Sequence, residues 1–244
     1  METLSIDSSL FWVALVQIVM INILLSGDNA VVIALASRNL PPQQQKQAIL
    51  FGSFGAIALR VILTFFAAYL LTLPYLKLAG GALLLWIGIN LLGSQDEDEH
   101  MDAHSNLLAA IKTIIVADFV MSLDNVIGVA AAAKGSLLLL LIGLGISIPL
   151  IVYGSTVILK LMRRFPVIVT VGAGLLGYVA GEMGVSDPVV SGWVEEHAPL
   201  LHQVAPWAFA ALVVAIGKWL SARSAGEAAE LAEVDAVEVE ESAR

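Results

Sequence analysis

The chain has 244 residues, of which 59% are apolar and 14% are charged, and its mean hydropathy is +0.89. This composition excludes an ordinary water-soluble domain and is typical of a membrane protein, and the absence of cysteine excludes disulfides, thiolate metal sites and cysteine nucleophiles. The net charge of −9 comes from two acidic segments, 96–102 and 227–241, because the remainder of residues 1–222 has nine acids and ten bases.

Seven apolar runs are long enough for a helix to cross about 30 Å of hydrocarbon. Proline, glycine and charged residues separate the runs, as expected of turns at a membrane surface. The third and sixth runs are short, and the first and fourth are long enough to be tilted or interrupted. The sequence therefore predicts an all-α, polytopic membrane helix bundle. Its seven spans lie near residues 10–36, 48–73, 76–92, 107–133, 136–161, 167–183 and 204–222.

Basic residues flank the predicted spans unequally, with eight on one side and two on the other. Because cytoplasmic loops carry the excess of Lys and Arg, the N-terminus is predicted outside and the C-terminus in the cytoplasm. The eight are Arg38, Lys46, Lys112, Lys160, Arg163, Arg164, Lys218 and Arg223, and the two are Lys77 and Lys134.

A polar motif recurs in the first and fourth spans. Ser26-Gly27-Asp28-Asn29 matches Ser122-Leu123-Asp124-Asn125, and Asn22 matches Asp118. Three spans separate the copies, so the two helices run in opposite directions, which indicates a 3+3 inverted-topology repeat with the seventh span appended. Gly27 is expected to loosen the first helix, and Leu123 at the equivalent position indicates that this break is one-sided.

The domain boundaries follow from the repeat and from composition. One membrane domain covers residues 1–222, and the acidic tail has the composition of a solvated cytoplasmic extension that is disordered or partly helical. The parts are repeat 1 at about 10–92, an acidic cytoplasmic loop at 93–105, repeat 2 at about 107–183, the seventh span at about 204–222 and the tail at 223–244.

The motif offers only oxygen ligands, which suit hard divalent cations such as Mn²⁺, Mg²⁺ or Ca²⁺. A carboxylate at the centre of a spanning helix costs about 2.5 to 3.5 kcal/mol, so its presence is by default a functional hypothesis. Carboxylates that release a cation can take up protons, which favours cation/proton exchange. The candidate ligands are Asn22, Ser26, Asp28, Asn29, Asp118, Ser122, Asp124 and Asn125.

Other interpretations stay open. The Asn and Ser side chains can simply join helices by hydrogen bonds, and an aspartate can pair with Arg60 in a buried ion pair. Whether Arg60 pairs with a site carboxylate or elsewhere is open, and Asn90 and Glu182 are further accessory candidates. An aspartyl protease dyad of Asp28 and Asp124 is a weaker reading, because Leu25 replaces an expected glycine. A non-transporting scaffold of export machinery is a third.

These motifs resemble the TerC family of integral membrane proteins, and within it the short bacterial branch of YjbE-type metal transporters. The resemblance implies a LysE-like inverted-repeat fold of seven or more spans in the bacterial cytoplasmic membrane. It also implies export of Mn²⁺ as cargo, including supply to secreted enzymes, with no catalysis and with Asp28, Asp118 and Asp124 as the acidic membrane residues. The matching stretches are Leu25–Ala34, Met121–Val126, Leu73–Lys77, Ala180–Met183 and Ser186–Pro188.

Overall fold

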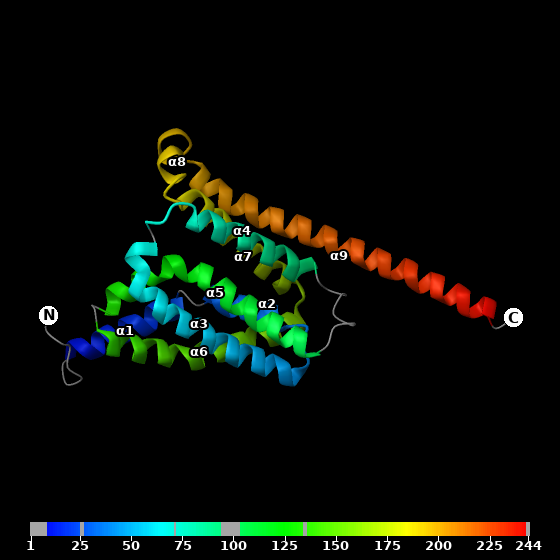
Figure 1. The fold of residues 1–244 in the computed structure, drawn as a ribbon, viewed down its shortest axis with the longest axis horizontal. Helices are drawn as coiled ribbons and strands as arrows, with labels where there is room; N and C mark the ends of the chain where they lie inside the picture. The colour runs from blue at the N-terminus through cyan, green and yellow to red at the C-terminus, as the bar shows by residue number, and fades with distance from the viewer. Residues whose placement is uncertain (1–8, 25–26, 71, 94–102, 134–135, 243–244) are drawn as a thin grey trace.

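A computed structural model describes residues 9–24, 27–70, 72–93, 103–133 and 136–242. These residues form nine helices and, within those ranges, no strand (Figure 1). The predicted all-α polytopic architecture is confirmed. The helices are α1 Ser9–Leu24, α2 Gly27–Ser37, α3 Pro42–Leu70, α4 Leu76–Gly93, α5 Ala103–Ala133, α6 Leu137–Arg164, α7 Val167–Ser186, α8 Ser191–His197 and α9 Leu201–Ser242.

Six of the described helices are long and apolar enough to cross a membrane. Each matches one of the predicted second to seventh spans, and proline marks where two of them begin, at Pro42 in α3 and Pro166 before α7. The count of seven crossings stays a prediction, since it depends on the first span. The six segments are Pro42–Phe66, Leu76–Gly93, Asn106–Leu123, Leu137–Arg164, Val167–Ser186 and Leu201–Ser224.

The predicted first span is two helices instead of one. α1 ends at Leu24 and α2 begins at Gly27, whereas α5 continues through Leu123. With a rise of 1.5 Å per residue, α1 is about 24 Å long and α2 about 17 Å, so each alone is shorter than the hydrocarbon core. The expected interruption falls on residues 25–26, which lie outside the described residues, and it stays a prediction.

The helices pack in two groups (Figure 1). α3 lies along α5 while α6 lies along α1 and α2, and α4, α7 and α9 pack together on the other side. In the predicted repeat, α1 and α2 together correspond to α5, α3 corresponds to α6, and α4 corresponds to α7. The packing of α3 on α5 then corresponds to the packing of α6 on α1 and α2, and the α4–α7 pair corresponds to itself. This pattern agrees with the predicted inverted repeat.

Glycines let α7 approach its neighbours closely. A Cβ at Gly81 of α4 would lie 2.8 Å from the carbonyl oxygen of Ala180, and one at Gly181 would lie 2.7 Å from that of Ala205. Since such contacts are too short for a side chain, the backbones of α4, α7 and α9 pack directly on one another.

The acidic tail differs from its prediction. α9 continues as one helix to Ser242 and extends past the other helices in Figure 1. Alanine and glutamate are good helix formers, and extending an existing helix costs no new nucleation, so the tail is helical where its composition favoured disorder. Most of the predicted loop 93–105 lies outside the described residues.

Candidate functional site

The centre of the bundle holds a buried ion pair between α3 and α5. The guanidinium Nη2 of Arg60 lies 2.7 Å from the carboxylate Oδ1 of Asp118, and Arg60 is only 1% exposed. Arg60 is the largest fully buried side chain among the described residues. The open question about its partner is thus answered: Arg60 pairs with a predicted site carboxylate.

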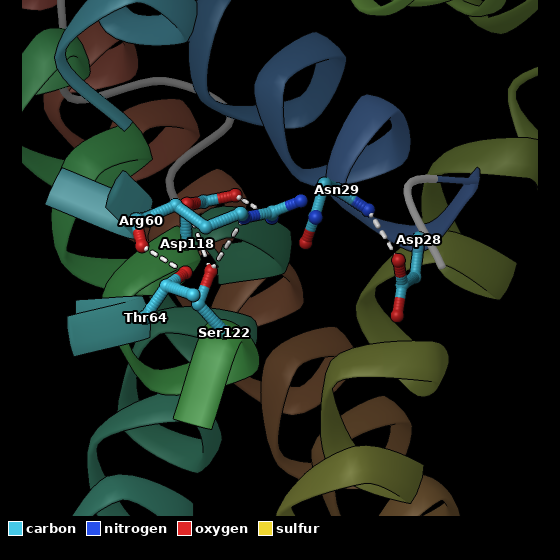
Figure 2. A network of polar contacts seen from close by, with 6 residues as sticks. All are labelled: Asp28, Asn29, Arg60, Thr64, Asp118 and Ser122. Carbon is cyan, nitrogen blue, oxygen red and sulfur yellow. Dashed lines mark hydrogen bonds and ion pairs between the residues drawn. The ribbon is translucent and has the colours of Figure 1, made fainter. Parts of the chain in front are cut away.

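Ser122 closes this pair into a triangle (Figure 2). It lies one helical turn after Asp118, so both side chains are on the same face of α5. Its hydroxyl donates to Oδ2 of Asp118 at 3.1 Å and accepts from Nε of Arg60 at 3.0 Å. The Thr64 hydroxyl donates to the backbone carbonyl of Arg60 at 2.7 Å, so this hydrogen bond is made inside α3 and not to α5. Both oxygens of Asp118 therefore have a donor.

The first motif copy faces the same region from α2. Asp28 lies in the first turn of α2, where the positive end of the helix dipole favours a carboxylate. Its Oδ1 accepts the backbone N–H of Asn29 at 2.8 Å. Asn29 is only 2% exposed, and Figure 2 shows its side chain between Asp28 and the guanidinium of Arg60. The two motif copies thus meet across α2, α3 and α5.

The structure leaves part of the predicted ligand set undetermined. Ser26 lies outside the described residues, and for Asn22 and Asp124 only the backbone, in α1 and α5, is described. Asn125 is half-buried on α5, seven residues after Asp118 and so on the same face. The predicted equivalence of Asp28 and Asp124 stays a prediction.

The two accessory candidates differ from Arg60 in burial. Asn90 near the end of α4 and Glu182 on α7 are both exposed, so the third and sixth spans do not bury the polar residues that the repeat aligns. Among the residues described, no group of three or more His, Cys, Asp or Glu side chains could hold a metal ion. Among the described side chains, a cation in this region would draw on amide, hydroxyl or backbone oxygens beside Asp28 and Asp118.

Asp187 is a buried carboxylate to which the sequence assigned no role. It follows α7, is fully buried, and accepts the backbone N–H groups of Tyr75 at 3.2 Å, Leu78 at 3.2 Å and Val189 at 2.9 Å. Burial alone raises the pKa of Asp187, but these N–H donors outweigh it and hold the pKa below the ordinary value of 3.8. Asp187 thus ties the start of α4 to the end of α7. The sequence feature that could have identified this residue is an aspartate directly before Pro188 at the end of a predicted span.

Several membrane proteins are similar to this chain in sequence. The integral membrane protein TerC family matches residues 7–225. The uncharacterized membrane protein YjbE of Bacillus subtilis is 46% identical over 187 residues, which are 77% of this chain and 86% of YjbE. The uncharacterized membrane protein YceF of the same organism is 26% identical over 182 residues, 70% of each chain. No solved structure matches.

Proposed function

Because the chain belongs to the integral membrane protein TerC family, as its motifs predicted, we propose that it exports a divalent cation, Mn²⁺, from the cytoplasm. The observation that carries this proposal is the pair of motif copies that meet across α2, α3 and α5, with the carboxylates Asp28 and Asp118 inside a membrane domain. Mn²⁺ is cargo here, and we propose no catalytic activity.

The donor chemistry supports a hard cation. The described groups around Arg60 are carboxylate, amide and hydroxyl oxygens, which suit Mn²⁺, Mg²⁺ and Ca²⁺ better than Zn²⁺ or Cu²⁺. Carboxylates that lose the cation can carry protons instead, so a proton is the proposed counter-ion. The choice of Mn²⁺ among hard cations rests on the family resemblance.

The break between α1 and α2 supplies further groups. The last four carbonyls of a helix have no partner within it, and the first four N–H groups are likewise unpaired within theirs. With a break at residues 25–26, the carbonyl oxygens at the end of α1 would suit a cation. At the start of α2, the Asn29 N–H donates to Asp28. Broken helices of this kind form ion sites at the midplane of transporters.

The orientation needed for export is supported by contacts at the helix ends. Nη2 of Arg163 donates to Oε1 of Gln45 at 2.6 Å, and Nε2 of Gln45 donates to the carbonyl of Arg38 at 2.9 Å, so basic residues gather at one end of the bundle. Lys77 lies at the start of α4, at the opposite end of the bundle, where its ammonium contacts the Ser186 hydroxyl at 3.5 Å. We place the first end in the cytoplasm of a bacterial inner membrane.

A second candidate function has one observation in its favour. Arg60 is paired with both Asp118 and Ser122, and these bonds alone can serve to hold α3 and α5 together. This part of the structure therefore also fits a non-transporting membrane scaffold. A scaffold predicts that purified protein has no Mn²⁺ flux. It also predicts that loss of the Asp28 charge has no effect on partner binding or on flux.

The test is Mn²⁺ flux into liposomes that contain the purified full chain. We expect flux with the wild type and its loss in Asp28→Asn and Asp124→Asn, because each removes a charge while keeping the side-chain shape. Asp235→Asn in the distal part of α9 is the matched control and is expected to transport normally. Wild-type liposomes without Mn²⁺ flux would reject the proposal in favour of the scaffold.

A further inference from the structure

We infer that Arg60 is a tethered counter-cation that competes with the transported ion for Asp118, and that this competition selects for divalent over monovalent cations. The inference rests on the proposed function. It gives a role in selectivity to a residue of the second span, which lies outside the repeated motif.

The hydrogen bonds show why a cation must displace Arg60. Oδ1 of Asp118 is held by the guanidinium at 2.7 Å, and Oδ2 accepts the Ser122 hydroxyl at 3.1 Å. The Ser122 oxygen itself accepts from Nε of Arg60 at 3.0 Å. A metal ion that coordinates Asp118 therefore competes with the guanidinium for Oδ1 and with the Ser122 hydroxyl for Oδ2, and it meets the positive charge of Arg60 at close range.

Arginine is the residue type that makes this competition strict. Its guanidinium stays protonated at all physiological pH values, so Arg60 cannot leave Asp118 by losing its proton. It has to move or to be outcompeted. Removing either member of a buried ion pair leaves the other charge uncompensated, which is strongly unfavourable. A competing cation must therefore replace the charge that Arg60 supplies.

The surroundings provide a second acceptor for the displaced guanidinium. Asn29 lies directly beside it in Figure 2, and Asp28 follows on the same helix. A long and flexible side chain can thus turn from α5 toward α2 without leaving the polar region.

Charge decides which cations succeed. A monovalent ion that takes the place of Arg60 brings the same single charge and loses the two fixed hydrogen bonds of the fork. A divalent ion brings one charge more, and in a region shielded from water that extra charge is strongly attracted to the two carboxylates. K⁺ and Na⁺ therefore do not displace Arg60 from Asp118, whereas a divalent cation does.

The experiment is a titration of purified full-length protein in detergent with Mn²⁺ alone, by calorimetry. We expect Arg60→Gln to bind Mn²⁺ more tightly than wild type by about tenfold or more, because the competing charge is gone. Arg60→Lys keeps the charge and is expected to stay near wild type. Arg164→Gln, which removes an exposed arginine at the end of α6, is the control and is expected to match wild type.

Selectivity gives the second readout. With excess K⁺, compared with choline at the same ionic strength, Mn²⁺ binding of wild type is expected to be unchanged and that of Arg60→Gln to weaken. A purely structural role of Arg60 predicts weaker binding or unfolding in Arg60→Gln, never tighter binding with new K⁺ sensitivity. A folded Arg60→Gln protein that binds Mn²⁺ equally or more weakly overturns the inference.

A measurement on the wild type covers the case in which Arg60→Gln does not fold. Infrared difference spectra of protein labelled with heavy-nitrogen arginine report the guanidinium environment. We expect Mn²⁺ to shift these bands in wild type, with the shift absent in Arg60→Lys. Mn²⁺ binding without a guanidinium shift overturns the inference alone, whereas a wild type that binds and transports no Mn²⁺ overturns the proposed function as well.

Discussion

The repeat position of Asp118 and its ion pair with Arg60 lead to different expectations for the substitution Asp118→Asn. Its counterpart in the repeat is Asn22, so repeat symmetry alone favours a mild effect of Asp118→Asn on transport. In the structure Asp118 is the counter-ion of Arg60, which is 1% exposed. Asp118→Asn is therefore expected to lower the free energy of unfolding by about 3–5 kcal/mol, since it leaves a buried charge unpaired.

Denaturant unfolding in detergent measures this effect. The double variant Arg60→Gln/Asp118→Asn removes both charges and keeps both shapes, so we expect it to recover most of the stability lost in the single variant. Equal stability of Asp118→Asn and wild type would show that the ion pair contributes nothing to the fold.

Ser122 tests the hydrogen-bond part of the same network. Ser122→Ala removes the donor to Asp118 and the acceptor of Arg60 but no charge. We expect Mn²⁺ affinity to fall by no more than about 1–2 kcal/mol, the scale of one hydrogen bond in a membrane domain, and the sequence predicts the same for Ser26→Ala. A complete loss of binding in calorimetry would make Ser122 a primary ligand.

At this scale the sequence predicted contacts along one helix and left the partner of Arg60 on another helix open. The spacing of four residues places Asp118 and Ser122 on one face of α5, and the structure confirms their hydrogen bond. The partner Arg60 is 58 residues earlier in the chain. Which face of α3 meets α5 is decided by packing of the whole bundle, so no local pattern contained it.

Asp187 links two elements and makes their packing pH-dependent. Its folded pKa lies below its ordinary value of 3.8 because three backbone N–H groups donate to its carboxylate despite burial. A lowered pKa means that the stabilisation is fully present above the ordinary value and is lost as pH falls through the folded pKa. We expect the melting temperature to fall in this acidic range.

The variant Asp187→Asn removes the charge and keeps one acceptor oxygen. We expect it to lower the free energy of unfolding by about 1–3 kcal/mol at neutral pH, the cost of unsatisfied buried donors, and to flatten the acid dependence of the melting temperature. Tyr75 strengthens this expectation, because its backbone φ of 66° is a strained conformation that Asp187 helps to hold. A variant with the same acid profile as wild type would assign that profile to other carboxylates.

The break between α1 and α2 is the element that distinguishes the two repeats. A Cβ at Gly27 meets nothing within 4 Å, so packing does not require glycine there. Alanine favours a helix by about 1 kcal/mol over glycine, so Gly27→Ala is expected to favour a continuous helix and to slow Mn²⁺ flux without lowering the melting temperature. Normal flux in Gly27→Ala liposomes would separate the break from transport.

On the scale of the whole molecule, the sequence predicted the helices well and their arrangement only in part. Hydropathy located six long helices, whereas the inverted repeat indicated by the recurring motif stays a prediction with which the packing is compatible. The second and fifth spans align poorly in sequence, yet α3 and α6 occupy corresponding places in that pattern. Many different sequences can form a lipid-facing or glycine-lined helix surface. Two helices can therefore occupy equivalent positions while sharing few identical residues.

The orientation of the whole chain depends on whether α1 and α2 together cross the membrane. If they do, there are seven crossings and the two termini lie on opposite sides; if they fold back together, there are six and the termini lie on the same side. The short lengths of α1 and α2 allow either arrangement by length alone. The excess of basic residues at one end favours seven, with the N-terminus outside.

Single-cysteine labelling decides between these cases, and the chain has no native cysteine to interfere. We expect Ser5→Cys and Gly192→Cys to react with an impermeant reagent from outside intact cells, and His100→Cys and Ser242→Cys to react only after the cells are opened. Ser5→Cys protected while Gly192→Cys reacts would mean six crossings. His100→Cys reacting from outside would reverse the orientation, and with it the direction of transport, because the end that gathers Arg38 and Arg163 around Gln45 would then face away from the cytoplasm.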